Sequence, residues 1–83
     1  MMNRKYFVFC SINLDGEAQW KHEDGATTKL RYAEEFSYWD ARHLVSKTEG
    51  LMAFDTEYIW ARVNEEGKVR ASTLRKSQGR SWR

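Results

Sequence analysis

The chain of 83 residues contains no proline, only one cysteine and no long apolar run. Its cysteine, Cys10, has no partner for a disulfide within the chain, which favours a reducing compartment. The apolar run at residues 6–12 is much shorter than the roughly 18 residues of a membrane-spanning helix. It leads to Asn13 and Asp15 rather than to a small-residue cleavage site, so we interpret it as a strand and not as a signal peptide.

Acidic residues are absent from the end of the chain. Residues 67–83 contain six Lys or Arg and no Asp or Glu, a net charge of +6. Residues 1–66 contain eight Lys or Arg and twelve Asp or Glu, a net charge of −4. This asymmetry predicts one domain at residues 1–73, followed by a basic C-terminal tail at residues 74–83 that ends in RKSQGRSWR.

Motifs for catalysis or metal binding are also missing. The sequence has no glycine-rich phosphate loop, no nucleotide motif and no Ser-His-Asp pattern. Neither His22 nor His43 has a second His or Cys at the spacing of metal ligands. The acidic pairs at residues 34–35 and 65–66 point apart in a strand or turn, so neither pair converges easily on one bond. We therefore expect no metal, no cofactor and no enzymatic activity.

What the chain does have is aromatic side chains, twelve in all, and a strong strand pattern at residues 4–13. Alternation gives this strand two apolar faces: Tyr6, Val8, Cys10 and Ile12 on one, Phe7 and Phe9 on the other. A strand that is apolar on both faces is expected at the centre of a sheet. The dipeptide Asp15-Gly16 predicts a hairpin turn into a short strand at residues 17–22. Residues 27–33 are expected to be extended.

A helix is predicted at residues 38–49. Ser37 is a favourable N-cap, and an apolar stripe with helical spacing follows it: Ala41, Leu44, Val45 and Thr48. Gly50 is the expected stop. Two further extended runs, residues 51–64 and 68–73, are expected to pair through a tight turn at residues 64–67.

These elements predict an α+β domain in the order β-β-(β)-α-β-β. A single helix would pack on a mainly antiparallel sheet of about four to five strands.

A resemblance adds to this interpretation. The strand YFVFC (residues 6–10), the Asp15-Gly16 turn, Trp20 and the pattern A-x-x-F-S-x-x-D-A (residues 33–41) resemble small phage-encoded accessory proteins, over about residues 5–50. The resemblance implies a small protein of the bacterial host cytoplasm that acts by binding. Proteins of that kind bind and disable a host protein or ribonucleoprotein complex, such as a restriction or CRISPR complex.

Candidate partner-binding residues lie on the predicted helix and in the tail. Trp39 and His43 are four residues apart and share a helix face with Arg42. An ordinary solvated face is the alternative. Trp82 can fold back on its own sheet or insert into the pocket of a partner. Trp and Arg are enriched at protein interfaces, so the predicted contact set is Trp39, Arg42, His43 and Trp82.

Nucleic-acid binding is the alternative function. On an extended run, Tyr58, Trp60 and Arg62 would share a face that either stacks bases or packs under the helix. The basic residues for this alternative are Arg62, Lys68, Arg70, Arg75, Lys76, Arg80 and Arg83. A tail that only increases solubility is the simpler interpretation of the same charges. A homodimer joined along a strand edge is a third hypothesis.

Overall fold

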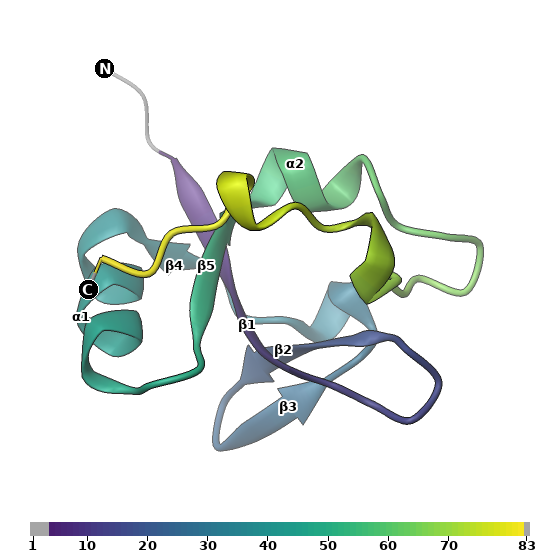
Figure 1. Cartoon of the computed structure of the whole chain (residues 1–83), viewed down its shortest axis with the longest axis horizontal. Helices are drawn as coiled ribbons and strands as arrows, with labels where there is room; N and C mark the ends of the chain where they lie inside the picture. The colour runs from purple at the N-terminus through teal and green to yellow at the C-terminus, as the bar shows by residue number, and fades with distance from the viewer. Residues whose placement is uncertain (1–3, 83) are drawn as a thin grey trace.

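The structure, a computed structural model, describes residues 4–82 (Figure 1). It confirms the α+β class: a five-stranded sheet packs against one main helix and one short helix. The strands are β1 (Lys5–Ile12), β2 (Ala18–His22), β3 (Gly25–Thr27), β4 (Phe36–Ser37) and β5 (Met52–Asp55). The helices are α1 (Tyr38–Lys47) and α2 (Thr56–Trp60), with 3-10 turns η1 (Leu30–Tyr32), η2 (Ala71–Thr73) and η3 (Lys76–Gln78).

Strand β1 is central, as its two apolar faces predicted. Phe9 pairs with Trp20 of β2 and with Met52 of β5, so these two strands lie on opposite edges of β1. By the same reasoning β4 lies on the edge away from β5, because Tyr6 pairs with residues of both. The pairings of β1 with β2, β4 and β5, and of β2 with β3, are all antiparallel.

The two faces of β1 belong to two apolar clusters. One face packs under α1, in a cluster of Tyr6, Val8, Ala41, Val45 and Ala53. The other face packs under α2, Val69 and Leu74, in a cluster of Phe7, Ala18, Trp20, Leu30, Phe54, Ile59 and Val69. Figure 1 accordingly shows α1 and α2 on opposite sides of β5.

The predicted extension of residues 27–33 is wrong beyond Thr27. Strand β3 ends at Thr27, and the Thr27 hydroxyl accepts a hydrogen bond from the Lys29 N–H at 3.1 Å. This local bond turns the chain away from the sheet, since a Thr side chain competes with ladder pairing in this way. The turn η1 follows and places Leu30, which is 1% exposed, in the core.

The predicted second hairpin is also wrong. Strand β5 ends at Asp55, whose carboxylate accepts a hydrogen bond from the Glu57 N–H at 2.9 Å. Asp55 therefore caps α2 where a longer strand was expected. Ile59 and Val63 appeared to alternate along a strand, but their spacing of four residues also suits one face of a helical turn. Ile59 is buried and Val63 packs against the same cluster.

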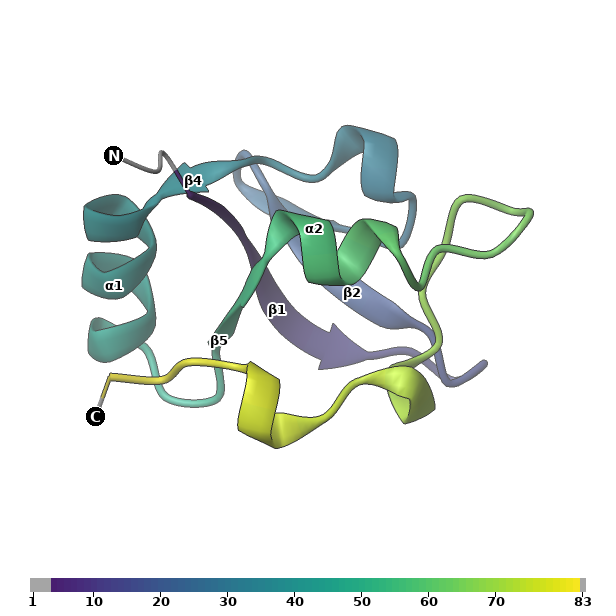
Figure 2. The same cartoon turned by 90° about the horizontal axis from the view of Figure 1, so that it is seen from above.

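Residues 68–82, here called the C-terminal segment, run along one side of the sheet (Figure 2). Val69 is buried, and its carbonyl accepts a hydrogen bond from the Ala18 N–H at 2.8 Å. Farther along, Arg80 pairs with Ala53 of β5 through both backbone groups, at 2.8 and 2.9 Å. The segment that sequence patterns set apart as a tail is thus in contact with the sheet at several points.

Gly79 lies against the side chains of β5. A Cβ atom at this position would lie 2.7 Å from Met52 Cγ and 2.9 Å from Phe54 Cζ. Only a glycine permits this close approach of the C-terminal segment to β5. Within residues 4–82, neither helix is long and apolar enough to cross a membrane.

Candidate partner-binding surface

The start of α1 is determined locally. The Ser37 hydroxyl accepts a hydrogen bond from the Asp40 N–H at 3.2 Å, so Ser37 is the N-cap that the sequence predicted. Ala41 and Val45 then face the sheet and are fully buried. Because these residues fix the inner face of α1, Trp39 and Arg42 must lie on its outer side. Trp39 is 70% exposed.

Tyr38 joins three of the four predicted contact residues, Trp39, Arg42 and Trp82, into one surface. Its ring packs edge-on against Trp39, with centroids 5.1 Å apart, and against Trp82, with centroids 5.5 Å apart. Its hydroxyl accepts a hydrogen bond from Arg42 Nη1 at 3.1 Å. The Arg42 guanidinium also lies over the Trp39 ring, 5.6 Å from the centroid. We call this set, Tyr38, Trp39, Arg42 and Trp82, the α1 aromatic surface.

Trp82 is half-buried against its own domain. Its ring lies edge-on to Tyr6, with centroids 6.0 Å apart, as well as to Tyr38. Its φ of 53° is in the left-handed region, which is unusual for a bulky residue. The sequence left two alternatives for Trp82, folding back on its own sheet or inserting into a partner. In the structure the ring folds back on its own domain, and part of it remains exposed to solvent.

His43 is exposed on α1, one turn after Trp39. Its Nε2 lies 3.4 Å from the Lys47 ammonium, on the side away from the N-terminus of the helix. No ring contact joins His43 to the α1 aromatic surface among residues 4–82. It extends that surface along the helix instead of forming part of its centre.

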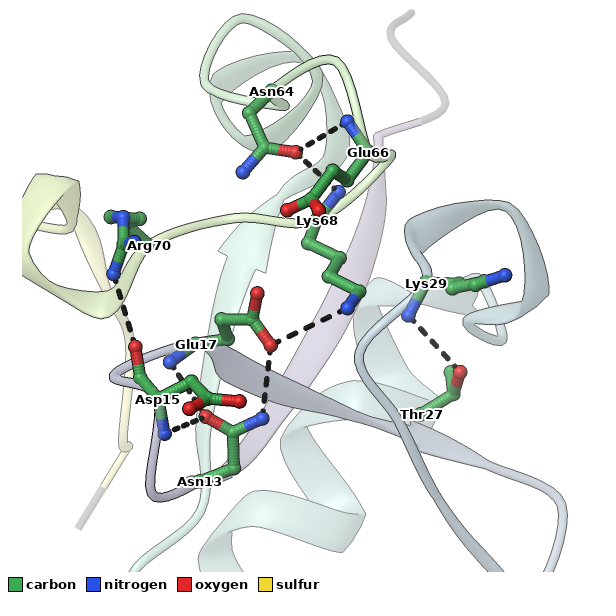
Figure 3. A network of polar contacts seen from close by, with 9 residues as sticks. All are labelled: Asn13, Asp15, Glu17, Thr27, Lys29, Asn64, Glu66, Lys68 and Arg70. Atoms are coloured by element: carbon green, nitrogen blue, oxygen red, sulfur yellow. Dashed lines mark hydrogen bonds and ion pairs between the residues drawn. The ribbon is translucent and has the colours of Figure 1, made fainter.

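Three of the basic residues considered for nucleic-acid binding make contacts within the domain. The Arg62 guanidinium lies 3.7 Å from the Tyr58 ring centroid and donates to the Tyr58 and Thr73 carbonyls at 3.0 and 3.2 Å. Arg70 donates to the Asp15 carbonyl at 3.0 Å, and Lys68 lies 3.7 Å from Glu17 (Figure 3).

Glu17 is the centre of the polar network in Figure 3. It is 7% exposed, and it accepts a hydrogen bond from Asn13 Nδ2 at 3.0 Å beside its ion pair with Lys68. Its backbone also forms a β-bridge with Arg70. A buried carboxylate needs such partners. Lys68 through this ion pair, and Arg70 through its bond to the Asp15 carbonyl, join the C-terminal segment to the first turn. Tyr58 and Trp60, expected on a strand face, lie on α2, where Tyr58 stacks on Phe54.

The remaining basic residues of the C-terminal segment point to solvent. Arg75, Lys76 and Arg80 are exposed, and their side chains make no ion pair within residues 4–82. Arg83, also predicted for this role, lies outside the described residues. The structure thus divides the predicted basic set into contacts within the fold and free surface charges.

The other chemical candidates do not converge. Cys10 is half-buried; burial raises the pKa of its thiol, and Lys21 opposes this only in part. A thiol held in its neutral form is a poor nucleophile. Glu34, Glu35, Glu65 and Glu66 are exposed. The part of the chain from residue 4 to residue 82 contains no group of three His, Cys, Asp or Glu that could hold a metal ion.

Sequence patterns did not assign Tyr38 to the contact set. Its position four residues before Arg42 on a helix is the spacing at which side chains meet, and that spacing is visible in the sequence. Its contact with Trp82 is not visible there, because 43 residues of chain lie between the two. Comparisons with protein-family models, curated proteins and solved structures found no match for this chain.

Proposed function

We propose that this protein is a non-catalytic binding protein that docks on a partner protein through the α1 aromatic surface. The observation that carries the proposal is the exposed but fixed ring of Trp39. It is 70% exposed, yet its position is set by contacts with Tyr38 and Arg42. A large ring held in place at the surface offers contact area at a low cost in conformational entropy.

The composition of the surface supports this proposal. Trp, Tyr and Arg are the residues most enriched among those that dominate binding energy at interfaces. Solvated faces of small domains seldom display such a cluster, because an 83-residue chain needs its large side chains for the core. An exposed cluster of this kind therefore favours a partner over simple solvation.

The form of action that we propose is inhibition of a host protein or ribonucleoprotein complex by a phage-derived protein. The resemblance of residues 5–50 to phage accessory proteins supports it, as does the lack of catalytic motifs in the sequence. A protein that only occupies a surface of its target needs one rigid contact surface and no chemistry of its own. The α1 aromatic surface fits that requirement.

Nucleic-acid binding by residues 68–83 ranks second. Its support is the +6 charge of residues 67–83 and the free positions of Arg75, Lys76 and Arg80. It is weakened because Arg62, Lys68 and Arg70 already make contacts within the domain. Fewer free cations mean fewer phosphate contacts and lower affinity.

The test is affinity capture from bacterial lysate with the tagged chain and two tryptophan variants. We expect the wild-type chain and Trp60→Ala to retain a stoichiometric host complex and Trp39→Ala to lose it. A central tryptophan contributes about 2 kcal/mol or more to binding, roughly a thirtyfold change in Kd. Trp60 is the control because it is also exposed, at 46%, but lies on α2, where its ring packs edge-on against Phe7. Thermal unfolding should show that both variants remain folded.

Two results would reject the proposal. Capture that is equal for wild type and Trp39→Ala would show that the α1 aromatic surface is not the contact. Binding to mixed DNA or RNA that weakens steeply between about 50 and 200 mM salt, with no protein captured, would favour the nucleic-acid function. In that case Arg75→Gln with Lys76→Gln should reduce the salt dependence.

A further inference from the structure

An apolar groove separates the C-terminal segment from the sheet. Its volume is ≈ 330 Å³, which is near the lower end of the about 300–1,000 Å³ typical of small-molecule sites. It shares no residue with the α1 aromatic surface. The side chains that shape it come from β1, β5 and the C-terminal segment: Phe9, Ile12, Met52, Phe54, Leu74 and Lys76.

Hydrogen bonds hold the part of the C-terminal segment that lines the groove. The Ala71 N–H donates to the Gly16 carbonyl at 2.9 Å, and the Arg75 N–H donates to the Tyr58 hydroxyl at 3.1 Å. Beyond the groove, Arg80 pairs with Ala53. The segment is therefore fixed before and after the groove, and the groove is formed before any ligand arrives.

The groove is lined by apolar side chains and one cation. Lys76 is the one charged side chain among the groove residues, and the others are apolar or glycine. Its ammonium makes no hydrogen bond or ion pair with any other residue from 4 to 82. A free cation at the rim of an apolar groove complements a ligand with an apolar body and one negative end.

An extended peptide fits this groove less well. Strand β5 pairs with β1 along one edge, and on its other edge the N–H and C=O of Ala53 are bonded to Arg80. A peptide that adds to a sheet needs free backbone groups along the edge. Here the C-terminal segment already uses them at Ala53.

We propose that the groove binds a small amphipathic anion, with its apolar chain against Phe9, Met52 and Leu74 and its carboxylate beside Lys76. Met52 suits this role because its unbranched, flexible side chain adapts to a ligand. Ile12 is 56% exposed at the groove, so a bound chain would also cover an apolar side chain that now meets water. This inference does not rest on the proposed partner protein.

Sodium decanoate, kept below its micelle-forming concentration, is the test ligand for the full-length protein. We expect saturable changes in the methyl NMR signals of Ile12, Met52 and Leu74, while those of Val45 under α1 stay unchanged. Decanol and decylamine, with the same chain and a neutral or positive end, should bind more weakly than decanoate. The order of the three ligands separates charge recognition from simple apolar binding.

The variant Lys76→Gln tests the charge directly. We expect it to weaken decanoate binding about two- to fivefold, the range for an ion pair exposed to solvent, and to leave decanol binding unchanged. Lys47→Gln on α1 is the matched control and should bind decanoate as the wild type does. Ala71→Leu, which adds a side chain to the groove, should reduce the binding of all three ligands.

Three results would overturn the proposal. One is the absence of saturable shifts with decanoate, and another is equal affinity for the three ligands. The third is a shift of the groove signals with protein concentration alone, which would mean that a second copy of the chain occupies the groove. If Ala71→Leu does not fold, Lys76→Gln still tests the proposal, because it changes only an exposed side chain.

Discussion

Residues 5–55 hold all five strands and α1, whereas residues 56–82 hold only the five-residue α2 and two 3-10 turns. In the first region the backbone pairs mainly through the ladders of the sheet and within α1. In the second, isolated long-range bonds and bridges join the chain to the first region, such as Ala18 to Val69, Leu30 to Gly67 and Ala53 to Arg80. The second region nevertheless supplies Ile59 and Val69 to the core. Residues 56–82 depend on the sheet for their shape, and they in turn cover the apolar face of the sheet that contains Phe7.

The largest effect is expected for Ile59→Ala. Ile59 is fully buried between α2 and the sheet, so its truncation should lower the free energy of unfolding by about 2–5 kcal/mol. Urea unfolding followed by circular dichroism measures this loss. Leu14→Ala is the control and should change stability by less than about 0.5 kcal/mol, because Leu14 is fully exposed. A small loss for Ile59→Ala would mean that residues 56–82 do not share the core of the sheet.

Gly79→Ala should have the next largest effect. The new methyl group would collide with Met52 and with the buried ring of Phe54, at a cost of about 1–3 kcal/mol. We also expect faster amide hydrogen exchange at Arg80, because the pairing with Ala53 would loosen. Gly25→Ala is the matched control, since no atom beyond its two chain neighbours lies within 4 Å of its Cβ position. Equal stability of the two variants would refute the close approach of the C-terminal segment to β5.

Ser37→Ala tests the region whose structure is determined locally. Loss of the N-cap bond to the Asp40 N–H should destabilise the protein by about 1 kcal/mol, and Ser37→Asp should restore most of it. Ser46→Ala, inside the same helix, should be neutral, because its hydroxyl only bonds the His43 carbonyl. If Ser37→Ala were also neutral, packing rather than capping would determine where α1 begins.

The smallest effect concerns Cys10. Burial raises the pKa of its thiol, so the midpoint of the pH dependence of alkylation by iodoacetamide should lie above that of a free cysteine peptide. Lys21→Gln should raise the midpoint further, because Lys21 favours the thiolate. Because the folded state disfavours the thiolate, Cys10 makes the free energy of unfolding depend on pH. Its contribution to stability is fully present below the pKa of the unfolded chain and is lost as the pH rises through the pKa of the folded protein. A midpoint at or below that of the free peptide would contradict the burial.

Local patterns were sufficient where one side chain determines the backbone beside it. Ser37 caps α1, and Asp15-Gly16 forms the first turn with Gly16 at a φ of 79°. Alternation from Tyr6 to Phe9 separates the two core clusters. The prediction that Ile12 shares the face of Tyr6 is wrong, because the register of β1 shifts between Phe9 and Ser11 and Ile12 lines the groove with Phe9. Local patterns also failed at residues 56–63, where Ile59 and Val63 suit a strand or a helix equally well. The choice between them came from Asp55, which ends β5 and caps α2.

The candidate surface was likewise predictable only in part from the sequence. The spacing of Trp39, Arg42 and His43 on one helix places them outward, and this much was readable from the sequence. That Trp82 joins them through Tyr38 was not, since the contact depends on how the C-terminal segment crosses β5. The apolar groove was equally unpredictable, because its walls come from β1, β5 and residues 71–76.

The sequence by itself determined the α+β class, the central β1, the start of α1 and the charge difference between the two parts of the chain. Periodicity, capping and turn chemistry act between near neighbours, so they can be recognised along the chain before the fold is known. Only the tertiary structure decided that RKSQGRSWR docks on its own domain up to Trp82, and that Lys68 and Arg70 hold the first turn. Such contacts join residues far apart in the chain, and their positions depend on the packing of the whole core.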